Sequence, residues 1–136
     1  MTSTTPKYMA VQGAALLVAA GFIVIGALGL VPGVTTGGKL FGVFAISGLH
    51  NVLHLLSGFV GFALARTYAA SRAYFLGGGL FYLALWVLGL FIGIGLLPIN
   101  SADNWLHFSL GFGMVLLGLT LAGQRDPTKR QRGKRV

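Results

Sequence analysis

The sequence contains no cysteine and no glutamate, and its only acidic residues are Asp103 and Asp126. The absence of cysteine excludes disulfide bonds, thiolate metal sites and cysteine nucleophiles. The shortage of acids excludes the paired carboxylates that general acid-base catalysis and di-iron cages require. We therefore expect a protein without enzymatic activity.

Charge of either sign is scarce throughout most of the chain. Only 9% of the 136 residues are charged, 55% are hydrophobic, and the mean hydropathy is +0.83. These values lie outside the composition of soluble globular domains. The sequence therefore predicts one domain whose solvent is lipid.

Four apolar runs are long enough to cross a bilayer, whose hydrocarbon core of roughly 30 Å takes about 20 helical residues. Because lipid cannot satisfy a bare backbone, each run is expected to be a helix, which predicts an all-α integral membrane four-helix bundle. The expected spans form a domain over residues 8–123, at 8–31, 41–65, 73–97 and 104–123, between a short segment 1–7 and a basic tail 124–136. Residues 41–47 are either an interfacial or re-entrant segment or the first turns of one long, tilted helix.

The basic residues lie almost entirely on one side of these spans. Lys39 is the only basic residue in the first and third connections, whereas Arg66 and Arg72 lie in the second. Short loops rich in Lys and Arg remain cytoplasmic, so both termini are expected inside a bacterial plasma membrane. Nucleic acid is not expected as a partner, because basic residues beside a span attract anionic lipids by about 1 kcal/mol each. Those of the tail are Arg125, Lys129, Arg130, Arg132, Lys134 and Arg135.

A nine-residue pattern, N-x-L-H-x-x-x-G-F, occurs twice, beginning at Asn51 and again at Asn104, 53 residues later. This spacing is about the length of one helical hairpin with its loop. An even number of spans separates the two copies, so both hairpins are expected to point the same way. The sequence thus predicts a bundle built from two parallel-repeat helical hairpins.

All the histidines fall in or beside the two repeats. His50, Asn51 and His54 are expected on the second span, and Asn104 and His107 on the fourth. In one interpretation these side chains form hydrogen bonds between helices, each worth about 0.6–2 kcal/mol, and no cofactor is bound. In the alternative, His50, His54 and His107 bind a transition metal, or His54 and His107 ligate haem b from opposite helices.

Glycine is abundant, with 22 residues, and small residues allow close helix approach in lipid. We expect these glycines to serve internal packing, with contact to an oligomer or a partner as the alternative. Tyr82 and Trp86 fall in mid-span, where they are expected to pack. The glycines expected at helix contacts are Gly58, Gly61, Gly89, Gly93, Gly111 and Gly118.

The motifs around His50 to Gly58 and Asp103 to Gly111 resemble those of small bacterial four-span membrane proteins grouped as a domain of unknown function. The resemblance covers about residues 8–123. The resemblance implies the fold and a plasma-membrane location. It assigns neither an activity nor a cofactor to the chain. We expect a non-enzymatic accessory or structural subunit of a larger membrane complex, or a homo-oligomer. The alternative is a carrier of a small solute or a lipid.

Overall fold

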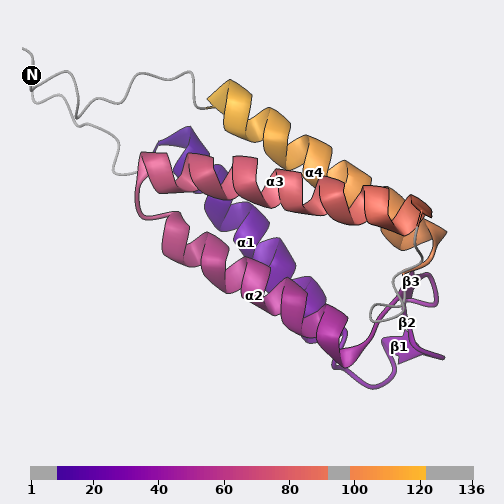
Figure 1. Ribbon diagram of the computed structural model, residues 1–136. Helices are drawn as coiled ribbons and strands as arrows, with labels where there is room; N and C mark the ends of the chain where they lie inside the picture. Colours follow the sequence, from indigo (N-terminus) through magenta and orange to yellow (C-terminus); the bar gives the residue numbers. More distant parts are fainter. Residues whose placement is uncertain (1–8, 92–98, 122–136) are drawn as a thin grey trace, which may run out of the picture.

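The computed structural model describes residues 9–91 and 99–121. It is mostly helical, as expected, although the expectation of an all-α chain is corrected by three short strands in the first connection (Figure 1). Positive φ values at Gly37, Gly38 and Gly42 allow the tight reversals between these strands. The elements in chain order are α1 (Ala10–Leu28), β1 (Thr35–Thr36), β2 (Lys39–Leu40), β3 (Phe44–Ala45), α2 (Gly48–Leu64), α3 (Tyr68–Phe91) and α4 (Ser101–Thr120).

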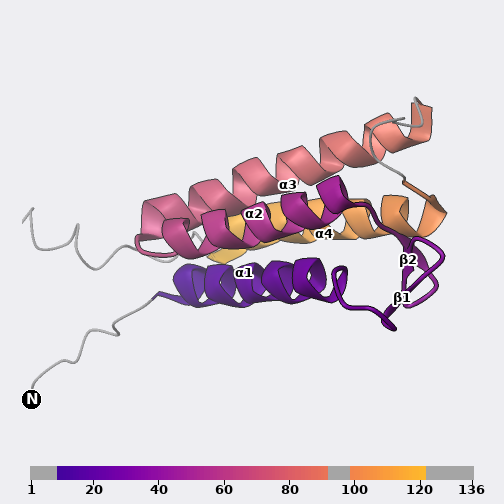
Figure 2. The same cartoon turned by 90° about the horizontal axis from the view of Figure 1, so that it is seen from below.

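The helices pack as two hairpins, α1 with α2 and α3 with α4, and contacts between the hairpins are far fewer (Figures 1 and 2). Within the described residues, α1 and α3 are long and apolar enough to cross a membrane. The 17-residue α2 is also apolar but shorter. Large apolar side chains such as Leu17 and Phe59 are exposed on the outside of the bundle, as on surfaces that contact lipid or a partner.

The second helix begins later than the expected boundary at residue 41. Strands β1, β2 and β3 form an antiparallel sheet in that order, with Leu40 paired to Phe44, at one end of the bundle (Figure 1). Ser47 then caps α2, because its hydroxyl accepts a hydrogen bond of 3.1 Å from the His50 backbone N–H. Residues 41–47 therefore precede α2, and the alternative of one long helix from residue 41 is wrong.

The other boundaries shift for local reasons. Helix α1 is shorter than the expected 8–31, since Gly29 follows its last helical residue. Helix α3 begins at Tyr68 rather than residue 73, because Thr67 Oγ1 accepts a hydrogen bond from the Ala70 N–H. Helix α4 begins at Ser101 rather than residue 104, because Asn100 and Asp103 form a capping box around its first turn. The expected boundaries at residues 8, 97 and 123 lie outside the described residues.

The end of the bundle opposite the sheet is held by a buried glutamine. Gln12, which is 7% exposed, donates from Nε2 to the carbonyl oxygens of Ala65, at 3.2 Å, and Arg66, at 3.0 Å. Carbonyl groups at a helix C-terminus have no partner within the helix. Gln12 therefore closes the α1–α2 hairpin by satisfying two of them.

Candidate functional site

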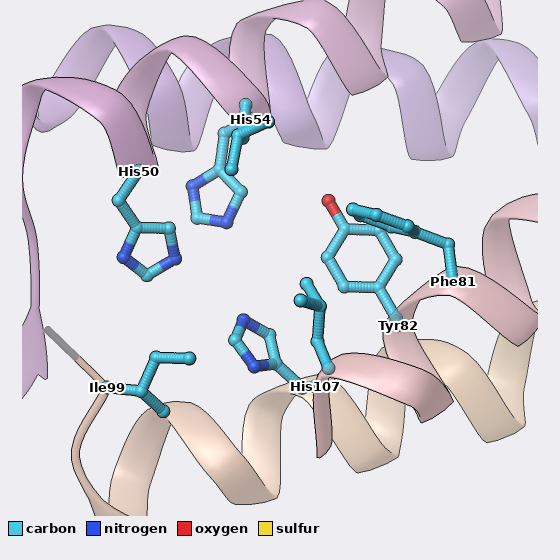
Figure 3. Close-up of a pocket in the computed structure, with 8 residues that line it drawn as sticks. His50, His54, Phe81, Tyr82, Ile99 and His107 are labelled. Carbon is cyan, nitrogen blue, oxygen red and sulfur yellow. The ribbon is translucent and has the colours of Figure 1, made fainter. Parts of the chain in front are cut away.

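Three histidine rings come together between the hairpins near the sheet. His50 and His54 extend from α2, and His107 extends toward them from α4 (Figure 3). The ring centroid of His50 lies 4.6 Å from that of His54 and 5.9 Å from that of His107. All three residues are buried, with exposed fractions of 5% or less. We call this group the histidine cluster.

Two aromatic rings complete the cluster from the other two helices. Tyr82 of α3 lies 5.8 Å from His107, and Phe22 of α1 lies 6.0 Å from His54, both measured between ring centroids. Phe22 and Tyr82 also stack on one another at 5.3 Å. The rings of the cluster and Tyr82 face a common space of about 10 Å³, which is about the volume needed for one water molecule (Figure 3).

Asp103 connects the cluster to the sheet. Its Oδ2 accepts hydrogen bonds of 3.0 Å from the backbone N–H groups of Ala45 and Asn100. The Ala45 carbonyl oxygen in turn lies 3.0 Å from His50 Nδ1. When Nδ1 carries the proton, it donates a hydrogen bond to this oxygen. Asp103 therefore holds β3 against the first turn of α4.

A second cavity lies beside the histidine cluster, between the sheet and the helices. Its volume is about 160 Å³, and its polar lining consists of His50, His54 and Asp103. The rest of its wall is apolar and includes Phe41 and Phe44. His50 and His54 therefore border both this cavity and the smaller space that Tyr82 lines.

The two asparagines lie against the partner helix of their own hairpin. Asn51 Nδ2 donates a hydrogen bond of 3.0 Å to the carbonyl oxygen of Gly29, in its own hairpin. A Cβ at Gly29 would lie 2.5 Å from Asn51 Cγ, and one at Gly89 would lie 2.8 Å from Asn104 Cγ. Each asparagine therefore occupies the space left by a glycine of the adjacent helix.

Glycines also set the spacing inside each hairpin. A Cβ at Gly58 would lie 2.8 Å from the carbonyl oxygen of Ala19, and one at Gly111 would lie 2.9 Å from that of Gly79. Gly61 lies against Ala19 and Tyr74, and Gly118 against Leu76 and Phe75. The sequence patterns did not single out Gly26 and Gly29, which make similar close contacts. Gly93 and all six basic tail residues lie outside the described residues.

The histidine cluster does not have the arrangement of a metal centre in the described part of the chain. No group of three or more His, Cys, Asp or Glu side chains there is placed to hold a metal ion. The metal and haem alternatives stay predictions. Within the same residues, Nδ1 of both His54 and His107 is buried without a hydrogen-bond partner.

Comparison with known proteins gives a family but no activity. Neither the curated proteins nor the solved structures contain a match to this chain. A family model described as Domain of unknown function (DUF4383) matches residues 12–120, which include all four helices almost completely. Since this match covers most of the chain, the protein belongs to the DUF4383 family.

Proposed function

We propose that this chain is a four-span protein of the bacterial plasma membrane with both termini in the cytoplasm. Two long apolar helices, an apolar exterior and the placement of charge support this topology. The exposed Arg66 lies in the turn between α2 and α3, and the exposed Arg72 lies near the start of α3, whereas Lys39 lies in the sheet at the opposite end (Figure 1). The turn would then face the cytoplasm and the sheet the outside.

Single-cysteine labelling tests this topology, because the chain has no cysteine of its own. Thr36→Cys in the sheet and Ala69→Cys beside the turn both replace exposed residues. A membrane-impermeant maleimide should label Thr36→Cys in intact cells and Ala69→Cys only after permeabilisation. Labelling of Ala69→Cys in intact cells would refute the orientation, and recovery of the protein in the soluble fraction would refute the membrane location.

The parallel-repeat architecture is supported by equivalent contacts in the two hairpins. Gly29 contacts Asn51 in the first, and Gly89 contacts Asn104 in the second. Likewise, the close approach of Gly58 to Ala19 corresponds to that of Gly111 to Gly79. In both cases the residues on α1 and α3 are 60 positions apart, and those on α2 and α4 are 53 apart. One constant offset on each helix pair is what a duplicated hairpin with loops of different lengths produces.

The bundle serves best as a non-enzymatic accessory or structural subunit of a membrane complex. The observation that carries this proposal is the buried histidine cluster, which joins side chains of both hairpins. Polar contacts of this kind fix the relative position of helices in lipid. The two acidic residues of the chain supply no carboxylate pair for catalysis.

Two measurements test the accessory role. Tagged protein isolated from its native membrane in mild detergent should retain one companion protein at a constant ratio through size-exclusion chromatography. If the tagged protein elutes without any companion, the accessory role is refuted. Replacement of His107 by Ala should destabilise the bundle by about 1–3 kcal/mol, because the packing of its buried ring against His50 and Tyr82 is lost. Trp105→Ala on the same helix replaces a side chain that is 66% exposed and should change stability much less.

A second candidate function is the carriage of a lipid. A groove between α2 and α3 favours it, since the groove is lined almost entirely by apolar side chains and lies between the hairpins. A polar solute would find few partners there. The groove therefore favours a lipid-soluble cargo over a small polar one.

A further inference from the structure

The groove between α2 and α3 is the largest of the cavities described above, with a volume of about 390 Å³. The two helices are joined by a turn of three residues, yet they pack far less closely on each other than each packs on its hairpin partner. Gly77 and Gly78 of α3 line the groove, and their missing side chains help to leave it unfilled. A volume of 300–1,000 Å³ is typical of sites for small organic molecules.

The polar groups of the groove are hydroxyls. Tyr82 and Ser57 are hydrogen bonded through their hydroxyl oxygens at 2.9 Å, and the Tyr74 hydroxyl donates to the Ser57 carbonyl oxygen at 3.1 Å. When Ser57 is the donor to Tyr82, the phenolic proton of Tyr82 is free for another acceptor. In that arrangement Tyr82 offers a hydrogen-bond donor where α3 lines the groove.

The groove adjoins the histidine cluster. Leu53, Phe81 and Tyr82 line both the groove and the small space between the histidine rings. His54 and His107 are 4% and 2% exposed, and their rings face this space (Figure 3). In the described residues the Nδ1 atoms of both rings lack a partner, although a buried polar group without one costs about 1–3 kcal/mol. A ligand with hydrogen-bonding groups would offset part of this cost.

The lining restricts the chemistry of such a ligand. It includes no Lys, Arg, Asp or Glu, so a phosphate, carboxylate or ammonium group would be buried without a counter-ion. The aromatic rings of Phe22, Phe81 and Tyr82 favour a flat apolar ring. The hydroxyl and imidazole groups favour neutral acceptors on that ring. We propose that the groove between α2 and α3 binds the head group of a lipid-soluble quinone, with a carbonyl oxygen accepting a hydrogen bond from Tyr82.

This proposal concerns binding alone. It rests on the membrane location and on the lipid-carrier candidate above, and it is independent of any accessory role. Cysteine labelling tests the location separately, so a failure of quinone binding in correctly inserted protein would overturn this proposal only.

The test uses the full chain in nanodiscs of phosphatidylcholine, titrated with a benzoquinone that carries a ten-carbon tail. Binding is followed by quenching of tryptophan fluorescence. Saturable quenching is expected for the wild type, and Tyr82→Phe should weaken it about tenfold, because one hydrogen bond of about 1.4 kcal/mol is lost. Gly77→Leu should abolish saturation, because Gly77 lines the groove and a leucine side chain there would fill it. A Cβ at Gly77 meets no atom within 4 Å, so the substitution should not disturb the fold.

Gly13→Leu is the matched control, since a Cβ there also meets nothing within 4 Å and Gly13 does not line the groove. It should bind like the wild type. Quenching that never saturates, or that is equal in Gly77→Leu and Gly13→Leu, would overturn the proposal. Equal affinity in Tyr82→Phe together with displacement by decylbenzene would show that the groove holds only an apolar chain, which would also overturn it.

Discussion

Gly89→Ala should separate the steric role of glycine from its effect on helix formation. A Cβ at Gly89 would lie 2.8 Å from Asn104 Cγ and 3.0 Å from Asn104 Nδ2, whereas carbon atoms in favourable contact are about 3.5–4.0 Å apart. The Asn104 amide must therefore move by roughly 1 Å in a packed interface. Overpacking of this size costs about 1–3 kcal/mol.

Gly77→Ala on the same helix provides the reference, because a Cβ there meets no atom within 4 Å. Both substitutions gain helix propensity of up to about 1 kcal/mol, so the difference between the two variants isolates the steric cost. We expect Gly77→Ala to be neutral or stabilising and Gly89→Ala to be less stable than Gly77→Ala by about 1–3 kcal/mol. The free energy of unfolding is measured by titration with sodium dodecyl sulfate in dodecyl maltoside micelles, followed by circular dichroism.

The double variant Gly89→Ala with Asn104→Ala makes the test sharper. Removal of the amide leaves space for the new methyl group, so the double variant should be no less stable than Asn104→Ala alone. The expected coupling between the two sites is thus about 1–3 kcal/mol. Equal stability of Gly89→Ala and Gly77→Ala, or simple additivity in the double variant, would refute the reasoning.

Three further predictions concern the ends of the bundle. Gln12→Ala should lower the free energy of unfolding by about 1–2 kcal/mol in the same titration, because two carbonyl oxygens lose their donor. Asp103→Ala should lower the free energy of unfolding by about 1–3 kcal/mol in the same titration, because the backbone N–H groups of Ala45 and Asn100 lose their acceptor. Replacement of the basic tail residues by Gln should reduce flotation of the protein with anionic vesicles but not with neutral vesicles. Unchanged flotation with anionic vesicles would contradict the proposed lipid contact. The residues to replace are Arg125, Lys129, Arg130, Arg132, Lys134 and Arg135.

The sequence predicts four helical segments well, because long apolar runs with few charges distinguish them from loops. It predicts their boundaries poorly where the loop is itself apolar. Phe41 to Ile46 reads as the start of a helix by hydropathy, although two of these residues form β3. The useful signals are local: Gly42 adopts a positive φ, and Ser47 is a good N-cap residue before α2.

The composition of the histidine cluster was only partly predictable. His50 and His54 are four residues apart and share one face of α2, so their meeting follows from helical spacing. Asn51 is one residue beyond His50, which rotates its side chain by about 100° toward α1. Phe22 and Tyr82 complete the cluster from helices whose sequences carry no polar pattern at these positions. Only the packing of the hairpins brings them to the histidines.

The two hairpins are connected at opposite ends of the bundle, and this arrangement limits how a ligand can enter the groove. At one end the chain itself joins α2 to α3. At the other, Asp103 accepts from the Ala45 N–H, and Asn100 Nδ2 donates to the Val43 carbonyl oxygen at 2.7 Å, so the sheet of the first hairpin is bound to the start of α4. Separation of the hairpins would break these hydrogen bonds, of which the one to Asp103 is buried, whereas the groove between the hairpins is already unfilled. A lipid-soluble ligand would therefore enter laterally, between α2 and α3, with both ends of the bundle intact.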